Sequence, residues 1–158
     1  MLAPGNQVET FGVHSQPHVV TALGEEMLLR TLNRRGPAES ADASAQARLD
    51  AIGRSQAVIE FSLDGRILGA NENFLAATGY SLDDVRGQHH SLFVEPEYRG
   101  SAEYRQFWEK LGRGEYDAGQ YRRLGKGGRE VWIQASYNPI LDLNGKPFKV
   151  VKYATDIT

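Results

Sequence analysis

The feature that most constrains this fold is a helical, loop-rich segment that lies between two groups of strand-like sequence. Strand patterns occur over 57–71 before the segment and over 117–156 after it. Because the strands on both sides can pair into one sheet, the segment between them must lie across one face of that sheet. We expect the stretch Gly87–Phe93 to help enclose a pocket there. The side chains whose chemistry could matter in such a pocket are those of His89, His90 and Trp108.

Alternating side-chain patterns and turn signals predict five antiparallel strands. The first strand spans 57–63, and Asp64-Gly65 predicts a tight hairpin that leads into a second strand over 66–70. Three further strands are predicted over 120–124, 130–141 and 148–155, with Asn144-Gly145 as another hairpin turn. The sequence therefore predicts an α+β fold, in which a five-stranded antiparallel sheet carries short helices on one face and follows an N-terminal helical extension.

Capping residues and helical spacing predict the helices between the strands. Asn71–Thr78 is a short helix in this interpretation. Ser81, with Asp84 three residues later, predicts the capped start of a second helix, and Pro96 is expected to break the segment that follows. Ser101–Leu111 has the strongest helical pattern. Its apolar residues at i, i+3, i+4 and i+7 are Tyr104, Phe107, Trp108 and Leu111.

The residues before the sheet have weaker patterns, and we divide the chain accordingly. Residues 1–45 are expected to form an extension that is partly disordered and partly helical, with a helix over 18–33. A helix over Ala45–Ser55 accounts for the short segment 46–56, and the compact domain follows over 57–158.

The composition excludes several classes of function. The chain has no cysteine, which excludes disulfides, thiol nucleophiles and cysteine metal sites. Its formal net charge of −2 gives no reason to expect a nucleic-acid partner. No apolar run approaches the roughly 18 residues of a membrane span, and no secretory signal is visible, so we expect a cytoplasmic protein. A solvated strand and turn explain the basic residues Arg122, Arg123, Lys126 and Arg129.

No group of residues indicates catalysis or a metal centre. Ser91 beside His90 is the only tempting nucleophile–base pair, and it has neither a glycine elbow nor an oxyanion-hole sequence. No third metal ligand stands at a suitable spacing from the two histidines. We therefore predict neither an enzyme nor a metal-binding protein.

An ordered set of short motifs over about residues 55–158 resembles the PAS domain, a small sensory module of bacterial signalling proteins. The motifs are Asp64-Gly-Arg66, Ala70-Asn-Glu-Asn-Phe74, Thr78-Gly-Tyr80, Gly87-Gln88, Gly127-Gly128 before Val131-Trp132, Asn138-Pro139-Ile140, Asp142, Asn144-Gly145 and Asp156-Ile-Thr158. No single motif is specific, but their order along the chain is. Gly87-Gln-His-His90, Phe107-Trp108 and Gly114-Glu-Tyr116 are most similar to the PAS domains of chemotaxis and aerotaxis transducers.

The resemblance implies a sensory function. Such a domain detects redox state, oxygen or a small ligand in its pocket and passes the signal through the sheet and flanking helices. It implies a helical signalling region C-terminal to Thr158 as the downstream partner. The alternative is a cofactor-free PAS domain that acts mainly in dimerisation or protein–protein interaction.

The alternation on the fourth strand predicts which of its sides faces the pocket. The small and apolar set lies on one face, and we expect it to line the pocket: Val131, Ile133, Ala135 and Tyr137. Trp132 then lies on the outer face, where an exposed indole is unfavourable. The helix over Ala45–Ser55 is the expected cover, from the same chain or from a second subunit, and the second case predicts a homodimer.

FAD is the first cofactor that the resemblance suggests, because Trp108 matches a flavin-associated tryptophan of aerotaxis receptors. A core aromatic residue on an amphipathic helix is the alternative explanation of Trp108, and the helical spacing favours it. The light-sensing flavin relatives grip the ring with Asn, Asn and Gln, and the matching residues here are Arg123, Ile133 and Ala154. The lack of cysteine excludes their photochemical adduct.

Haem is the second candidate and the absence of any fixed cofactor is the third. A neutral histidine is a usual axial ligand of haem iron, but only one of two adjacent histidines can face one iron. The alternative is that one histidine binds a backbone carbonyl and the other is solvated. The full set of candidate cofactor-binding residues is Trp108, His89, His90, Asn73, Phe93, Ile133 and Ala135.

Overall fold

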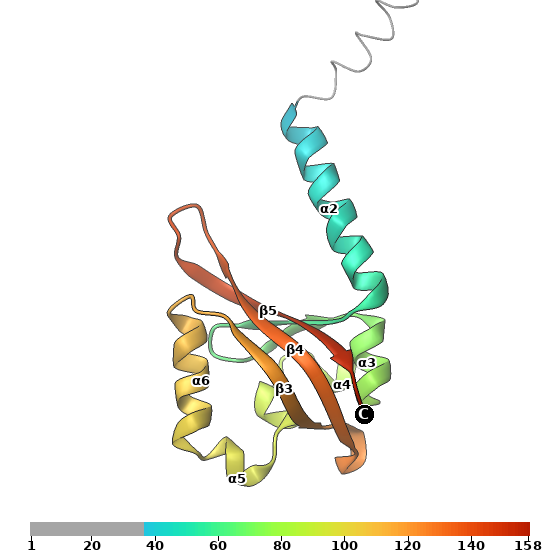
Figure 1. Ribbon diagram of the computed structural model, residues 1–158, viewed down its shortest axis with the longest axis vertical. Helices are drawn as coiled ribbons and strands as arrows, with labels where there is room; N and C mark the ends of the chain where they lie inside the picture. The colour runs from blue at the N-terminus through green and yellow to red at the C-terminus, as the bar shows by residue number, and fades with distance from the viewer. Residues whose placement is uncertain (1–36) are drawn as a thin grey trace, which may run out of the picture. The chain divides into compact units, whose positions relative to one another are not determined.

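The computed structural model describes residues 37–158, of which Ala45–Thr158 forms one compact unit (Figure 1). The helix predicted over 18–33 lies outside the described residues. The strands are β1 (Ala57–Ser62), β2 (Ile67–Ala70), β3 (Asp117–Leu124), β4 (Glu130–Leu141) and β5 (Pro147–Asp156). The helices are α2 (Pro37–Ser55), α3 (Glu72–Thr78), α4 (Leu82–Val85), α5 (Pro96–Arg99) and α6 (Ala102–Gly112), with 3-10 turns η1 (His90–Phe93) and η2 (Lys126–Gly128).

The five strands form one sheet in the order β2-β1-β5-β4-β3, and each neighbouring pair is antiparallel. The first strand thus pairs with the last, and β3, β4 and β5 form a meander beside them. The segment between β2 and β3 supplies α3 to α6 and η1, which pack across one face of the sheet (Figure 1). The predicted fold class is confirmed.

The short helices begin where their caps predict. Asn71 accepts a hydrogen bond from the Phe74 amide at the start of α3, and Ser81 and Asp84 form a reciprocal capping box at the start of α4. Pro96 interrupts the segment after Gly87, as predicted, and it also starts helix α5. Proline is well suited to the first helical turn, where its missing N–H has no intrahelical partner.

The two sides of β4 are assigned correctly by the sequence. Val131, Ile133, Ala135 and Tyr137 are all buried against the helical layer. Burial of Val131 and of Ile133 contributes roughly 1.5–3 kcal/mol each, so this face fixes the register of the strand. Trp132 is 39% exposed on the opposite face.

Helix α2 begins at Pro37, earlier than the predicted Ala45. In the described part of the chain, α2 does not cover Trp132. Leu49 and Ile52, the apolar residues of α2, are themselves exposed, as Trp132 is. Cover by a second subunit therefore stays a prediction.

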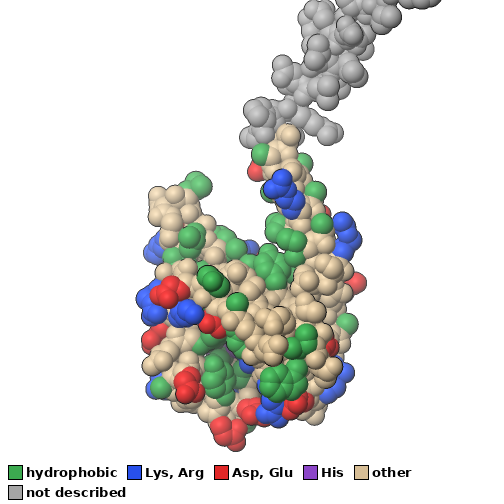
Figure 2. All heavy atoms as spheres, in the orientation of Figure 1, with side chains coloured by type: hydrophobic (Ala, Val, Ile, Leu, Met, Phe, Trp, Pro, Cys, Tyr) green, Lys and Arg blue, Asp and Glu red, His purple; other side chains and the backbone are tan. Residues whose placement is uncertain are grey.

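The face seen in Figure 2 carries hydrophobic side chains in several separate patches, and no histidine is visible among its coloured residues.

Candidate functional site

A fully buried histidine joins the helical layer to the sheet. The Nδ1 atom of His90 lies 2.9 Å from the hydroxyl of Tyr104 on α6, and Nε2 lies 3.1 Å from the hydroxyl of Tyr137 on β4. The sequence-based expectation of a backbone carbonyl partner is wrong for this residue. A histidine at the start of a 3-10 turn faces inward here, where two tyrosines from distant segments converge on it.

The surroundings keep His90 neutral. Burial holds the pKa of His90 well below its usual value, and the positive charges of Arg123 and Lys152 act in the same direction. Burial also raises the pKa of Tyr104 to about 12. A neutral imidazole has one donor and one acceptor nitrogen, so the two tyrosine hydroxyls satisfy both.

Trp108, one turn after Tyr104 on α6, also packs on this cluster. Its ring centroid lies 5.4 Å from that of His90 and 5.7 Å from that of Phe61, both in edge-to-face geometry. The Nε1 atom of Trp108 is buried and has no hydrogen-bond partner among the described residues. Trp108 is thus a partly buried aromatic residue that packs against the core and has one unused donor.

His89 has a local role at the start of η1. Its Nδ1 atom accepts a hydrogen bond of 3.0 Å from the Ser91 amide, and its ring lies against Gly65. A Cβ atom at Gly65 would stand only 2.6 Å from the His89 ring, and the positive φ of 82° also favours glycine there. The β1–β2 turn and the histidine pair therefore fit closely together.

A small cavity lies between α3 and η1 on one side and the inner face of the sheet on the other. Its volume is about 10 Å³, no more than one water molecule needs. Phe93 of η1 and both Val131 and Ile133 of β4 line it, whereas Ala135 and Tyr137, which were expected to line the pocket with them, do not. Two cationic side chains also line it, Arg123 of β3 and Lys152 of β5.

Both cations are buried, which corrects the interpretation of Arg123 as part of a solvated strand. Arg123 is 7% exposed and Lys152 is 1% exposed. The Arg123 guanidinium donates to the Tyr137 hydroxyl at 3.1 Å and to the Arg122 carbonyl at 2.8 Å, but its buried Nε has no partner among the described residues. The Lys152 Nζ lies 4.8 Å from the centre of the Tyr137 ring.

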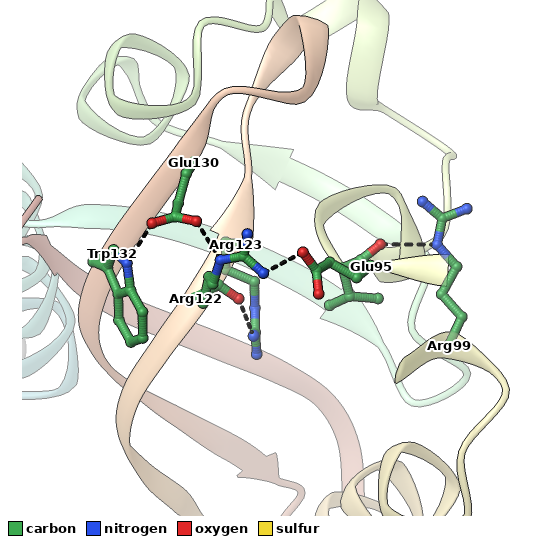
Figure 3. A network of polar contacts seen from close by, with 7 residues as sticks. Glu95, Arg99, Arg122, Arg123, Glu130 and Trp132 are labelled. Carbon is green, nitrogen blue, oxygen red and sulfur yellow. Dashed lines mark hydrogen bonds and ion pairs between the residues drawn. The ribbon is translucent and has the colours of Figure 1, made fainter. Parts of the chain in front are cut away.

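A second polar network lies on the outer face of the sheet, and Figure 3 shows it. The Trp132 indole donates to Glu130 at 2.8 Å, and Arg122 forms ion pairs with both Glu130 and Glu95. Glu95 precedes α5, so the network ties the outer face of β3 and β4 to the helical layer. Arg123, the next residue, is joined to this network only through its hydrogen bond to the Arg122 carbonyl (Figure 3).

The structure brings together most of the predicted site residues, in two neighbouring groups. His89, His90 and Trp108 meet in the aromatic cluster, and Phe93 joins it to the cavity that Ile133 lines. Ala135 is buried on the same face of β4. Asn73 lies elsewhere: it is exposed, and its Nδ2 atom donates to carbonyls at the C-terminal end of α2.

The sequence analysis missed Lys152 as an interior residue. The signal was present in the alternation of β5, where Val150, Lys152 and Ala154 share one face, and on β3, where Arg123 shares the parity of Tyr121. A charged residue within a strand is usually solvent-exposed, and that expectation hid the pattern.

The chain matches the sequence profile of the PAS fold over residues 67–154. This match spans more than half of the chain, so the protein belongs to the PAS family. Within residues 37–158, no three His, Asp or Glu side chains come together in a way that could hold a metal ion. None of the helices described here has both the length and the apolar character of a membrane crossing.

Two relatives in sequence are a biofilm dispersion protein and an aerotaxis receptor. The chain is 50% identical over 113 residues to the biofilm dispersion protein BdlA of Pseudomonas aeruginosa. This match covers 72% of the chain and 27% of BdlA. The chain is also 29% identical over 79 residues to the aerotaxis receptor of Escherichia coli K12. That match covers 50% of the chain and 15% of the receptor. The chain thus spans about a quarter of the first relative and less of the second.

Solved structures share the fold. The PAS domain of a Colwellia psychrerythraea protein superposes with a TM-score of 0.63 at 23% identity, over 72% of this chain and 97% of that domain. A light-oxygen-voltage domain studied with a flavin analogue gives a TM-score of 0.56 at 22% identity, over 77% of this chain and 84% of that one. These likenesses concern the fold alone.

Proposed function

We propose that this chain is the sensory PAS module of a chemoreceptor-type transducer, and that it detects a small molecule bound between the sheet and the helices. Both sequence relatives support this proposal, because their names describe proteins of biofilm dispersion and aerotaxis. We place the protein in the cytoplasm and expect a downstream signalling region after Thr158, as the resemblance implies. The proposal treats the domain as a binding module without catalytic residues.

The observation that carries the proposal is the hydrogen-bonded cluster around His90. One imidazole joins Tyr104 of α6 to Tyr137 of β4, and Tyr137 also binds Arg123 of the cavity wall. A molecule that enters the cavity meets this chain of hydrogen bonds. It can therefore change how the helical layer sits on the sheet, provided that it binds the two arrangements with different affinity.

The end of the chain offers a route for the signal out of the domain. The Trp132 amide donates to the Thr158 hydroxyl at 3.0 Å, and the Ile157 amide donates to the Trp132 carbonyl at 2.9 Å. Trp132 stands between Val131 and Ile133, which both line the cavity. A shift of β4 thus reaches Ile157 and Thr158, and it also moves the Trp132 indole on the outer face.

FAD is the first cofactor to test, since a flavin-associated light-oxygen-voltage domain shares the fold. The residues present do not fit an isoalloxazine ring as they are arranged, because the cavity has a volume of only about 10 Å³. Ile133 and Ala154, in its wall, have no polar side-chain group to hold the ring edge. The proposed route through the sheet does not depend on a flavin.

Haem fits less well. Both ring nitrogens of His90 are engaged by tyrosine hydroxyls, so iron could bind only after one of these hydrogen bonds breaks. The cavity would also have to expand far beyond its present volume. Haem is therefore the second cofactor to test, after FAD.

A module that acts mainly in dimerisation is the alternative function. The exposed indole of Trp132 and the exposed Leu49 and Ile52 favour it, because a second copy of the chain could cover these side chains. The two functions are compatible, since a homodimer can carry a sensory pocket in each subunit.

The absorption spectrum of the purified chain, followed by mass spectrometry of what it releases on denaturation, tests the sensory function. We expect a small molecule to be released, with a flavin band or a Soret band only if a cofactor is bound. A colourless protein that releases nothing and gains no stability from any small molecule would favour the dimerisation module instead.

Replacement of Trp132 by alanine in the full-length transducer tests the route. The indole is exposed, so we expect the free energy of unfolding to change by less than about 1 kcal/mol. The dimer fraction in light scattering and the downstream output should both fall. Tyr116→Ala, at another exposed aromatic residue, is the matched control. Unchanged dimerisation and output in the Trp132 variant would rule out this route.

A further inference from the structure

The inner face of the sheet holds two cations where an apolar core is expected. In the described structure, Ile59 of β1 pairs with Lys152, and Lys152 pairs on its other side with Tyr137. Arg123 reaches the same Tyr137 from β3 with its guanidinium group. The ammonium and guanidinium groups thus contact one tyrosine, and both side chains line one cavity.

Neither cation has a carboxylate partner. Among residues 37–158, none of the ion pairs involves Arg123 or Lys152. Asp117 is the nearby acid on β3, but its Oδ1 atom accepts from Lys110 at 2.8 Å and its Oδ2 atom accepts from the Tyr121 hydroxyl. Asp156, at the edge of the cavity, is exposed and binds the Thr158 amide.

Two buried cations without a counter-charge are unfavourable for the folded domain alone. A buried charge is normally paired, and an unpaired one loses its proton instead. Burial and the repulsion from Arg123 hold the pKa of Lys152 well below its usual range. The free domain therefore has a half-satisfied guanidinium beside an amine whose charged form burial disfavours, and an anion bound nearby would favour that charged form.

The remaining walls of the cavity are apolar. Phe74, Phe93, Val131 and Ile133 surround the two cationic groups. A ligand that matches both features has a negative charge at one end and an apolar body. Carboxylate suits a guanidinium because its two oxygens can each accept an N–H donor, and the free Nε of Arg123 supplies one.

We propose that the interior cavity binds a short-chain organic carboxylate, with Arg123 and Lys152 as its counter-charges. This inference rests on the proposed function, because it names the ligand class of that same site. The ligand must displace part of the wall, since the cavity has room for no more than one water molecule. Its carboxylate competes with the Tyr137 hydroxyl for Arg123, and this competition loosens the link between Tyr137 and His90.

Isothermal titration calorimetry on the full chain tests the inference with matched probes. Acetate, propionate and butyrate supply the charge with an apolar body of increasing length. Propionamide has the shape of propionate without the charge, and inorganic phosphate has the charge without the apolar body. We expect propionate or butyrate to bind, and propionamide and phosphate to bind at least about tenfold more weakly.

Lys152→Met tests the counter-charge directly. Methionine keeps the length of the side chain and is apolar, so the variant should fold and unfold at a higher denaturant concentration than the wild type without ligand. Its affinity for the carboxylate should fall by about tenfold or more. Lys149→Met is the matched control, because Lys149 is on the same strand but pairs with Glu60 on the outer face. That variant should bind as the wild type does.

The outcomes separate this inference from the proposed function. Equal binding of propionate and propionamide, or unchanged carboxylate binding in Lys152→Met, overturns the carboxylate inference. The carboxylate inference also fails if no carboxylate binds at any concentration. If an uncharged molecule is then found to bind the cavity, the sensory function stands and only the ligand class was wrong. If the chain binds no small molecule of any charge, both proposals fail.

Discussion

Arg122 and Arg123 are neighbours on β3, and they place the same chemical group in opposite surroundings. Arg122 lies on the outer face, with 42% of its side chain exposed, and pairs with Glu95 and Glu130. Arg123 lies on the inner face at 7% exposure and has no carboxylate partner in the described part of the chain. Water already stabilises the exposed Arg122, which has two carboxylate partners. The buried Arg123 needs such a partner more and has none in the described part of the chain.

This difference shows what each network can do. Exposed ion pairs contribute little to stability, because water solvates both charges well without the pair. A buried polar network has larger effects in both directions, since each unmade hydrogen bond has its full desolvation cost. We therefore expect the outer network to tune surface contacts and the inner one to respond to a ligand.

The largest expected effect is on the inner side, in Tyr137→Phe. Loss of the hydroxyl leaves His90 Nε2 and one guanidinium nitrogen of Arg123 without a partner. We expect the free energy of unfolding to fall by about 2–3 kcal/mol, measured from urea denaturation. Tyr116→Phe at an exposed tyrosine is the control and should change it by less than about 0.5 kcal/mol. Similar losses in both variants would mean that the buried Tyr137 hydroxyl contributes no more to the free energy of unfolding than an exposed one.

The second prediction concerns acid sensitivity, which the inner side should carry through His90. Its pKa in the folded protein lies well below the usual 6.5, so below that pH the unfolded chain binds a proton that the folded chain does not. The stability present above pH 6.5 is therefore lost as the pH falls. The slope from this one group approaches about 1.4 kcal/mol per pH unit.

Denaturation of the wild type and His90→Gln at several pH values between about 6.5 and 4.5 measures this slope. Carboxylates titrate in both proteins and cancel in the difference. The variant should be less stable near neutrality and should lose stability less steeply toward acid. Parallel curves for the two proteins would show that His90 is not the group that responds.

The alternation of side chains made much of this fold predictable. Strand β4 reveals its buried side because Val131, Ile133, Ala135 and Tyr137 recur at every second position, and the apolar face outweighs other preferences. The start of α4 was equally clear, because Ser81 and Asp84 satisfy each other's backbone groups locally. Local signals of this kind need no knowledge of the rest of the chain.

The polar interior was not predictable in the same way, because it depends on long-range contacts. His90 finds Tyr104 and Tyr137 only after three separate segments have packed together. The charge of Arg123 and Lys152 concealed an alternation that an apolar residue would have revealed. At these positions the sequence departs from the pattern of a stable core, and such departures are expected where a site has a function.

The smallest expected effect is on the outer side, in Arg122→Met. This change removes both ion pairs of the outer network but leaves no buried group without a partner, because Glu95 and Glu130 are partly exposed to water. We expect a loss of less than about 1 kcal/mol at low salt, and most of that loss should disappear in about 1 M NaCl, where the wild-type pairs are screened. Urea denaturation at both salt concentrations measures it. A loss above about 2 kcal/mol that salt leaves unchanged would show that the outer network is as strongly coupled as the inner one, and the contrast between the two arginines would then no longer hold.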